Sequence, residues 1–205
     1  RALSRRDPTS VLMAQGDVHK NMMQALLGAG AMAEDDLLSK LEECIGLHQD
    51  AAKRAKLKFA DNKDQDKATL DSVVSVLNTQ LDPLGLKVAK QRSKHDDKQV
   101  YYGIVNLRPD ELVKLGTNLD KGEQELFHKI LDEIDASEEK EIDEIGAHNK
   151  RNECTPRVSS DDATSCLQQL EHGQWLHKSD DGSFSLGIRI LLQRMYTSNA
   201  TAGEA

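Results

Sequence analysis

The residues of this sequence that could do chemistry are a short glycine motif, three cysteines, scattered histidines and one serine. Residues 28–33 fit a relaxed dinucleotide fingerprint, but that motif must follow a strand, and here it follows a helical pattern that it ends. Cys44 and His48 are four residues apart, yet two ligands do not make a tetrahedral zinc site. There is no HExxH motif, and Ser183 stands where a GxSxG motif around Ser185 would need glycine. The sequence therefore shows no catalytic constellation.

Length and composition narrow the class of protein. The chain has 205 residues, enough for one large domain or two small ones. Its 35 acidic and 27 basic residues give a net charge of -8, which argues against a uniformly basic nucleic-acid-binding module. No apolar run approaches the roughly 18 residues of a membrane span, so we expect no membrane partner. Three widely spaced cysteines, Cys44, Cys154 and Cys166, favour buried reduced thiols over a disulfide framework.

The first half of the sequence predicts three helices followed by a hairpin. Apolar spacing predicts a helix that begins with Asp17 as its N-cap and stops at residues 28–30. Residues 53–66 are polar and predict a partly helical loop. The remaining elements are helices at 37–46 and 67–82 and two extended runs at 86–91 and 99–107, joined by a polar tip at 92–98.

The same order recurs in the second half. In sequence, we expect a strong helix through residues 126–134, a weaker one at 141–148, a helix capped by residues 160–162, a tight hairpin with an Asp-Gly turn at 179–182, and a last helix at 188–196. The predicted class is mainly α with small β-hairpins (α+β), as tandem winged-helix domains. The predicted organisation is a flexible segment at 1–16, a first winged helix at 17–107, a linker at 108–118, a second winged helix at 119–197 and a flexible tail at 198–205.

Two surfaces of the first unit stand out. Met23 and Leu27 form a second apolar stripe on the first helix, and with Met32 they are candidate partner contacts, unless another part of the chain covers them. The hairpin carries five candidate phosphate contacts, namely Lys87, Lys90, Arg92, Lys94 and Lys98. The third helix offers Lys67 as its only cation, so we expect at most weak, non-specific DNA contact. A winged-helix DNA-binding regulator is the alternative function.

Two features of the second unit complete the sequence analysis. Residues 132–144 hold eight acidic residues and one lysine, which form either a solvated helix end and loop or a contact for a basic partner. Trp175 is expected to anchor the second core beneath its hairpin, in the company of Leu167, Leu176 and Phe184.

Four stretches of the chain carry a likeness to a known family, namely 17–27, 101–106 with 115–117, 125–127, and 175–176 with 185–189 and Leu191. In these stretches the chain resembles non-SMC element one, the RING-bearing subunit of the SMC five-six genome-maintenance complex. The resemblance extends from about residue 17 to residue 196.

The resemblance implies a tandem winged-helix body followed by a RING-like zinc module that supports ubiquitin ligation. It implies as partners a MAGE-type third non-SMC element, a kleisin subunit, the SMC heads and, through the zinc module, a ubiquitin-conjugating enzyme. It also implies a nuclear location and a role in DNA repair by recombination. No cysteine follows Tyr196, so we expect no cofactor in this chain, no catalytic or metal-binding residue, and no ligase activity of the chain alone.

Overall fold

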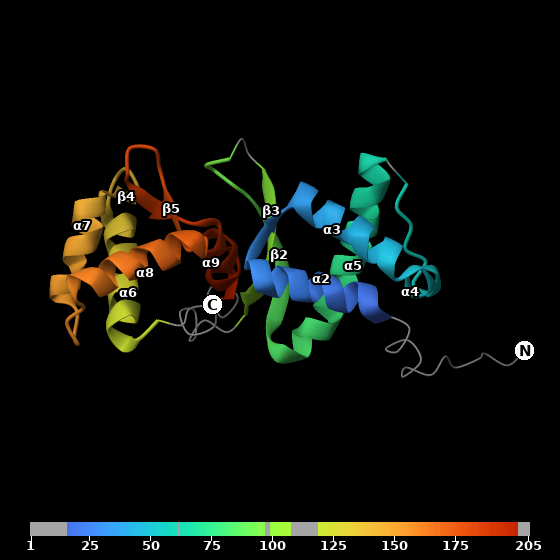
Figure 1. Cartoon of the computed structure of the whole chain (residues 1–205), viewed down its shortest axis with the longest axis horizontal. Helices are drawn as coiled ribbons and strands as arrows, with labels where there is room; N and C mark the ends of the chain where they lie inside the picture. Colours follow the sequence, from blue (N-terminus) through green and yellow to red (C-terminus); the bar gives the residue numbers. More distant parts are fainter. Residues whose placement is uncertain (1–15, 61, 97–98, 108–118, 201–205) are drawn as a thin grey trace, which may run out of the picture. The chain divides into compact units, whose positions relative to one another are not determined.

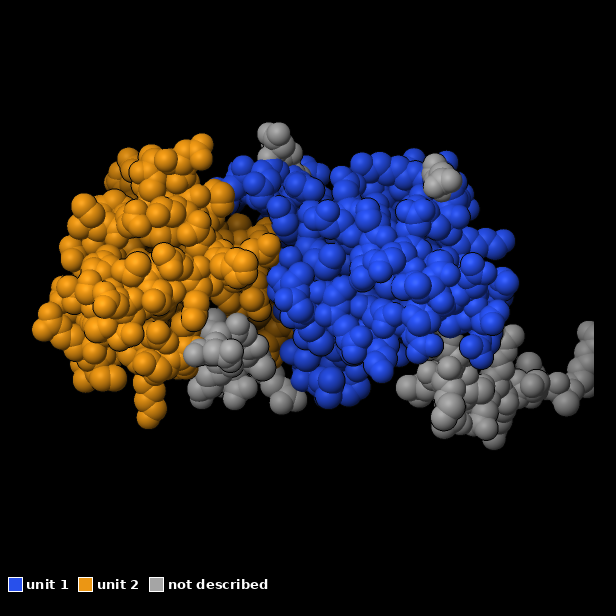
Figure 2. All heavy atoms as spheres, in the orientation of Figure 1, with its two compact units in different colours: residues 1–104 blue, residues 105–205 orange. Residues whose placement is uncertain are grey.

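The structure is a computed structural model that describes residues 16–60, 62–96, 99–107 and 119–200 (Figure 1). The chain divides into two compact units, residues 1–104 and 105–205 (Figure 2). Both are mainly helical, and each contains one small three-stranded sheet. The α+β class is therefore confirmed, while the predicted domain boundaries stay predictions. The predicted segment 1–16, apart from Gly16, and the predicted linker 108–118 lie outside the described residues.

Unit 1 is a helical body with a hairpin at its C-terminal end. In chain order its elements are α2 (Gly16–Ala29), β1 (Ala31–Ala33), α3 (Glu34–Leu47), α4 (Gln49–Arg54), α5 (Lys63–Leu81), the short 3-10 helix η1 (Asp82–Leu84), β2 (Leu86–Arg92) and β3 (Val100–Asn106). Its sheet has the order β1-β3-β2. The predicted hairpin is confirmed, with its strands one residue from the expected bounds.

The apolar face of α2 packs into the core of unit 1, as its spacing predicts. Val18, Met22 and Leu26 are each only 1% exposed. The helix stops at Gly30, whose φ of 77° lies in the left-handed region and whose N–H donates to the carbonyl of Leu26 at 2.9 Å. The predicted N-cap is wrong, because α2 already begins at Gly16 and Asp17 lies in its first turn. A carboxylate there still interacts favourably with the helix dipole.

Each sheet contains a short strand that the sequence does not predict. β1 pairs with β3, with Met32 opposite Tyr102. In unit 2, β4 (Glu141–Ile142) occupies the start of the predicted helix at 141–148, and α7 (Glu144–Asn149) begins after it. Strands of two or three residues are too short to show a period of two, and pairing with a distant strand stabilises them.

The polar segment 53–66 is partly helical, as expected. It contains the end of α4 and the start of α5, which begins four residues before the predicted helix. Asn62 is the N-cap, and its side chain accepts from the backbone N–H of Asp64 at 3.1 Å. Asp66 is buried and accepts from the backbone N–H of Ala60 at 2.8 Å, which attaches the preceding loop to the helix.

Unit 2 repeats the order of a helix, a short strand, further helices and a hairpin, and adds a last helix after it. It consists of α6 (Lys121–Ala136), β4, α7, the 3-10 helix η3 (Lys150–Glu153), α8 (Ser160–His172), β5 (Leu176–Lys178), β6 (Phe184–Leu186) and α9 (Ile188–Ala200). Its sheet order, β4-β6-β5, corresponds to that of unit 1. Helix α9 continues to Ala200, past the predicted end at Tyr196 and into the predicted tail.

Trp175 lies in the core of unit 2, as predicted, with Leu167, Leu176 and Phe184 in the same cluster. Its ring meets that of Phe127 edge to face, with centroids 6.2 Å apart. The guanidinium of Arg189 lies 3.9 Å from the Trp175 ring centroid, and burial lowers the pKa of Arg189. A side chain at residue 187 would collide with this arrangement, because a Cβ on Gly187 would lie 2.3 Å from the carbonyl oxygen of Gln174.

Candidate functional site

The three candidate partner contacts of unit 1 differ in the solvent exposure of their side chains. Leu27 is 58% exposed on the outward side of α2. Met23, on the same helix, and Met32, on β1, are half-buried and pack against the core of unit 1. The second stripe of α2 is therefore partly covered by its own unit, and Leu27 is its most accessible member. Whether a partner uses these residues stays a prediction.

The basic hairpin of unit 1 is partly neutralised by the unit itself. Lys90 forms an ion pair with Asp71 of α5 at 3.2 Å, and its ammonium lies 5.8 Å from the Tyr102 ring centroid. Lys87 is half-buried, whereas Arg92 and Lys94 are exposed. The fifth candidate, Lys98, lies outside the described residues.

The described part of the hairpin tip, residues 93–96, is ordered by polar contacts, one of which holds the carboxylate of Asp96. The hydroxyl of Ser93 accepts from the backbone N–H of His95 at 3.1 Å, and the hydroxyl of Tyr101 donates to the carboxylate of Asp96 at 2.9 Å. Burial, and then this hydrogen bond, raise the pKa of Tyr101 to about 12. A negative charge held at the tip weakens phosphate binding there.

The outward side of α5 is poorly suited to reading bases. Its two lysines both form ion pairs with the start of α3, Lys63 with Asp35 at 3.3 Å and Lys67 with Glu34. The hydrogen bond to Glu34 raises the pKa of Lys67. Because sequence-specific readers place cations and amides from this kind of helix in the major groove, these contacts favour a structural role for α5.

The two adjacent tyrosines of β3 have different environments. Tyr102 is 2% exposed, and its hydroxyl donates to the same Glu34 at 3.3 Å. Burial, and then the charge of Glu34, raise its pKa well above the usual value. Tyr102 therefore joins the sheet to α3 from inside the unit, while Tyr101 orders the hairpin tip.

The acidic run of unit 2 is only partly a solvated surface. The carboxylate of Asp135 makes two contacts of 2.7 Å with the guanidinium of Arg194 on α9, and Glu133 pairs with Lys150 at 2.8 Å. The hydrogen bond with Arg194 lowers the pKa of Asp135. Glu138 and Glu139 are exposed, so this part of the run remains available to a basic partner.

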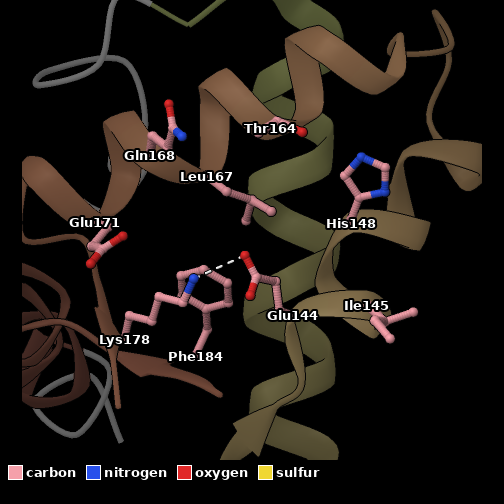
Figure 3. Close-up of a pocket in the computed structure, with 9 residues that line it drawn as sticks. All are labelled: Glu144, Ile145, His148, Thr164, Leu167, Gln168, Glu171, Lys178 and Phe184. Carbon is pink, nitrogen blue, oxygen red and sulfur yellow. Dashed lines mark hydrogen bonds and ion pairs between the residues drawn. The ribbon is translucent and has the colours of Figure 1, made fainter. Parts of the chain in front are cut away.

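A pocket of about 310 Å³ lies among α7, α8, β5 and β6 of unit 2 (Figure 3). Leu167 of α8 and Phe184 of β6 are buried and supply its apolar part. Glu144 of α7 pairs with Lys178 of β5 at 2.9 Å across it. The residues that line this pocket come from four elements, and the sequence analysis did not identify them as a site.

The three cysteines are buried free thiols, as their spacing suggested. Burial raises the pKa of the Cys166 thiol to about 12, so this group is neither a ready nucleophile nor a ready metal ligand at neutral pH. The ring of His48 contacts Asn21 at 2.8 Å and Asp17 at 3.6 Å, not a cysteine. Within the described ranges, no group of three or more His, Cys, Asp or Glu side chains could hold a metal ion. These residues do not fit a zinc site.

None of the helices in the described part of the chain is both long enough and apolar enough to cross a bilayer.

Comparison with known proteins gives consistent matches. The family model described as "Nse1 non-SMC component of SMC5-6 complex" matches residues 19–156. The protein "Non-structural maintenance of chromosomes element 1 homolog" of Xenopus laevis is 25% identical over 176 residues, which cover 85% of this chain and 60% of the relative. The human protein of the same name is 25% identical over 178 residues, covering 86% of this chain and 61% of the relative.

A solved structure agrees at the level of the fold. A chain of the structure described as "Nse1-Nse3-Nse4 complex" matches with a TM-score of 0.73 and 24% identity, over 91% of this chain and 75% of that chain. The present chain spans about 60% of the length of the curated relatives it matches. The family model covers more than half of the chain, and the residues of the four similar stretches lie in both units. The chain belongs to the family of the Nse1 non-SMC component of the SMC5-6 complex.

Proposed function

We propose that this protein is a docking subunit of the SMC5-6 complex, built from two winged-helix domains in tandem. The observation that carries the proposal is the family match over residues 19–156. The order of elements supports the winged-helix assignment, since in both units a helix, a short strand, further helices and a hairpin follow one another, and the first strand pairs with the last.

The partners we propose are the MAGE-type third non-SMC element, Nse3, and the kleisin, Nse4. The similar solved chain is described as part of a complex with these two proteins, which supports the proposal. Through them the subunit would reach the SMC heads and act in DNA repair and recombination in the nucleus. Ubiquitin ligation with a conjugating enzyme belongs, in this proposal, to a zinc-binding RING-like module of the full-length protein, and we assign no catalytic role to the described residues.

The chemistry of the described residues is that of a docking body. Its thiols are buried, and its described exposed large apolar side chains are Leu27, Leu47, Leu84 and Ile145. Stable interfaces bury roughly 1,000 Å² or more and depend on a few apolar or aromatic anchors. Leu27, with the half-buried Met23 and Met32 beside the core, is our candidate anchor group.

Co-purification of the full chain with Nse3 tests the proposal. We expect a stable complex from the wild type and a loss of about tenfold or more in recovered partner from Leu27→Asp, because a charge would replace an anchor. Leu27 is the sharpest probe, since Met23→Asp would also place a charge against the core. The matched control is Leu84→Asp, the same change at a leucine that is 64% exposed. If the wild type fails to bind Nse3, the proposed function is wrong. If Leu27→Asp binds Nse3 as well as the wild type does, only the assignment of Leu27 as an anchor is wrong.

The second candidate, a sequence-specific DNA-binding regulator, has less support. Only Arg92 and Lys94 of the five hairpin cations are exposed and described without an ion pair, and α5 uses its lysines to bind α3. We expect a gel-shift titration to give weak binding that disappears when the salt concentration is raised, as for a few phosphate contacts. Tight binding that survives raised salt and prefers one site would favour the regulator.

A further inference from the structure

Residues 53–58, which we name the basic segment, are a dense run of cations on the surface of unit 1. The segment runs from the end of α4 into the loop before α5, and no acidic residue lies within 51–60. Its four basic residues are all exposed, namely Lys53, Arg54, Lys56 and Lys58. Within unit 1, Figure 1 shows α4 on the side away from β2 and β3, so the basic segment is a separate surface from the basic hairpin.

The cations of the basic segment are not neutralised by the described part of the chain. On the hairpin, by contrast, Lys90 forms an ion pair with Asp71. None of the four cations forms an ion pair within the described ranges, and the Nε–H of Arg54 donates to the backbone carbonyl of Asp50 at 3.2 Å. A cation in the last turn of a helix also interacts favourably with the helix dipole, but Lys58 lies four residues past the end of α4, beyond the reach of this effect. The dipole therefore does not account for the whole run.

The backbone holds these cations in a defined turn. The N–H of Leu57 donates to the carbonyl of Ala52 at 2.9 Å and the N–H of Lys56 to the carbonyl of Lys53 at 3.1 Å, which are the paired hydrogen bonds of a Schellman C-cap. Leu57 and Ala52 are 7% and 2% exposed, so the turn is anchored in the core of unit 1. Lys56 has a φ of 57°, in the left-handed region that favours glycine. The chain thus carries a cation at a position where glycine would be less strained.

The surroundings of the basic segment distinguish between classes of anionic partner. A protein segment or a membrane surface normally requires apolar anchors beside the charges. Here Leu57 is buried and Phe59 is half-buried, and none of the exposed large apolar side chains in the described structure lies within 51–60. A nucleic-acid backbone requires only cations that reach neighbouring phosphates, and a duplex carries one phosphate per about 1.7 Å of its axis. The basic segment therefore suits phosphates in a polymer best.

We propose that the basic segment binds the phosphate backbone of duplex DNA without reading its sequence. Four exposed cations can neutralise about four phosphates, which gives weak binding that depends strongly on salt. Side chains that read bases are not required, in agreement with the ion pairs that occupy the lysines of α5. This inference goes beyond the proposed function, because it adds a ligand and a surface and requires neither Nse3 nor the anchor at Leu27.

Fluorescence anisotropy of a labelled duplex of about 20 base pairs, titrated with the full chain at several salt concentrations, tests the proposal. We expect the logarithm of the affinity to fall with the logarithm of the salt concentration with a slope of about -3 to -4. The combined variant Lys53→Gln, Arg54→Gln and Lys58→Gln should reduce this slope by about 3 and weaken binding about tenfold or more at about 50 mM salt. All three residues are exposed, so the core is not disturbed.

A matched control separates the basic segment from the net charge of the chain. The combined variant Lys121→Gln, Lys140→Gln and Arg157→Gln removes the same residue types and the same charge at exposed positions of unit 2. We expect it to weaken binding by less than about twofold, because these cations lie outside the basic segment.

Lys56→Gly separates DNA binding from folding. Glycine relieves the left-handed backbone, so the urea midpoint should be unchanged or higher, whereas the lost charge should weaken DNA binding about threefold. Absence of duplex binding at about 50 mM salt, equal losses in the two combined variants, or full binding by Lys56→Gly would overturn the proposal. Tighter binding of a poly-glutamate peptide than of the duplex would also overturn it and would make an acidic protein segment the ligand. Whether the chain binds Nse3 has no bearing on any of these outcomes.

Discussion

Units 1 and 2 share the order of a helix, a short strand, further helices and a hairpin, and the same sheet order, but their surfaces are different. Residues 17–107 hold 14 acidic and 13 basic residues, whereas residues 119–196 hold 17 acidic and 9 basic ones. The hairpin strands of unit 1 are seven residues long, and β2 carries Lys87, Lys90 and Arg92, while those of unit 2 are three residues long, carry Lys178 and are joined through an Asp-Gly turn. The same arrangement of core elements therefore presents two different surfaces, and the choice of partner must depend on those surfaces and not on the fold.

The interiors differ as well. Unit 2 builds its hairpin against an aromatic cluster of Phe127, Trp175 and Phe184, whereas unit 1 joins its sheet to the helices through aliphatic residues and the buried Tyr102. The substitutions below test this difference, from the largest expected effect to the smallest.

Trp175→Ala should have the largest effect. Removing a buried aromatic that contacts Phe127 and Arg189 leaves a cavity, and we expect a loss of about 3–5 kcal/mol in the unfolding free energy of unit 2. Calorimetry of the full chain should show the transition of unit 2 shifted to lower temperature while that of unit 1 is unchanged. An unshifted melting profile would contradict the aromatic core.

Gly187→Ala tests the close backbone approach beside Trp175. The new Cβ would lie 2.3 Å from the carbonyl oxygen of Gln174, so the backbone must move, and we expect a loss of about 3 kcal/mol. Gly46→Ala in unit 1 is the matched control. Nothing lies within 4 Å of its Cβ position in α3, so alanine should stabilise that helix by about 0.5–1 kcal/mol. Similar denaturation midpoints for the two variants would refute the close approach.

Tyr102→Phe removes the buried hydroxyl that donates to Glu34 in unit 1. We expect a loss of about 1 kcal/mol, measured by urea denaturation. Tyr101→Phe removes an exposed hydrogen bond to Asp96 and should cost less than half of that. The reverse order of effects would mean that the hairpin tip, and not the sheet-to-helix contact, stabilises unit 1.

Asp135→Asn should have the smallest effect, and one that depends on pH. The hydrogen bond with Arg194 lowers the pKa of Asp135 in the folded state. The ion pair therefore stabilises the protein above the unfolded-state pKa of about 4, and this stabilisation is lost as the pH falls through the lower folded-state pKa. Both side chains are more than a third exposed, so at pH 7 we expect only about 0.5 kcal/mol. The melting temperatures of wild type and variant should begin to converge below about pH 4 and meet once the pH is below the folded pKa of Asp135. A difference that does not shrink between about pH 4 and pH 2 would show that the asparagine acts through packing.

Much of the fold could be predicted because its helices are long and periodic. The apolar residues of α6 and the Asp-Gly turn between β5 and β6 have local signals, and Trp175 is a large apolar residue beside them. β1 and β4 could not be predicted, since strands this short exist only through pairing with residues far along the chain. The first residue of α2 was also missed, because Asp17 is as acceptable in the first turn as at the N-cap.

The surfaces were less predictable than the fold. Spacing on α2 separates Leu27 from the core face, but it does not reveal that Met23 is half-buried. Composition marks the hairpin as basic, but Lys90 pairs with Asp71, which is 19 residues away. The pocket of unit 2 draws on residues from four elements, so no local pattern in the sequence marks it.

Isothermal titration of the full chain with purified Nse3, with and without duplex DNA present, tests the central claim of a docking body most directly. The account predicts a one-to-one complex whose affinity DNA does not change. Absence of heat with Nse3, together with tight and salt-resistant binding of the duplex alone, would contradict it.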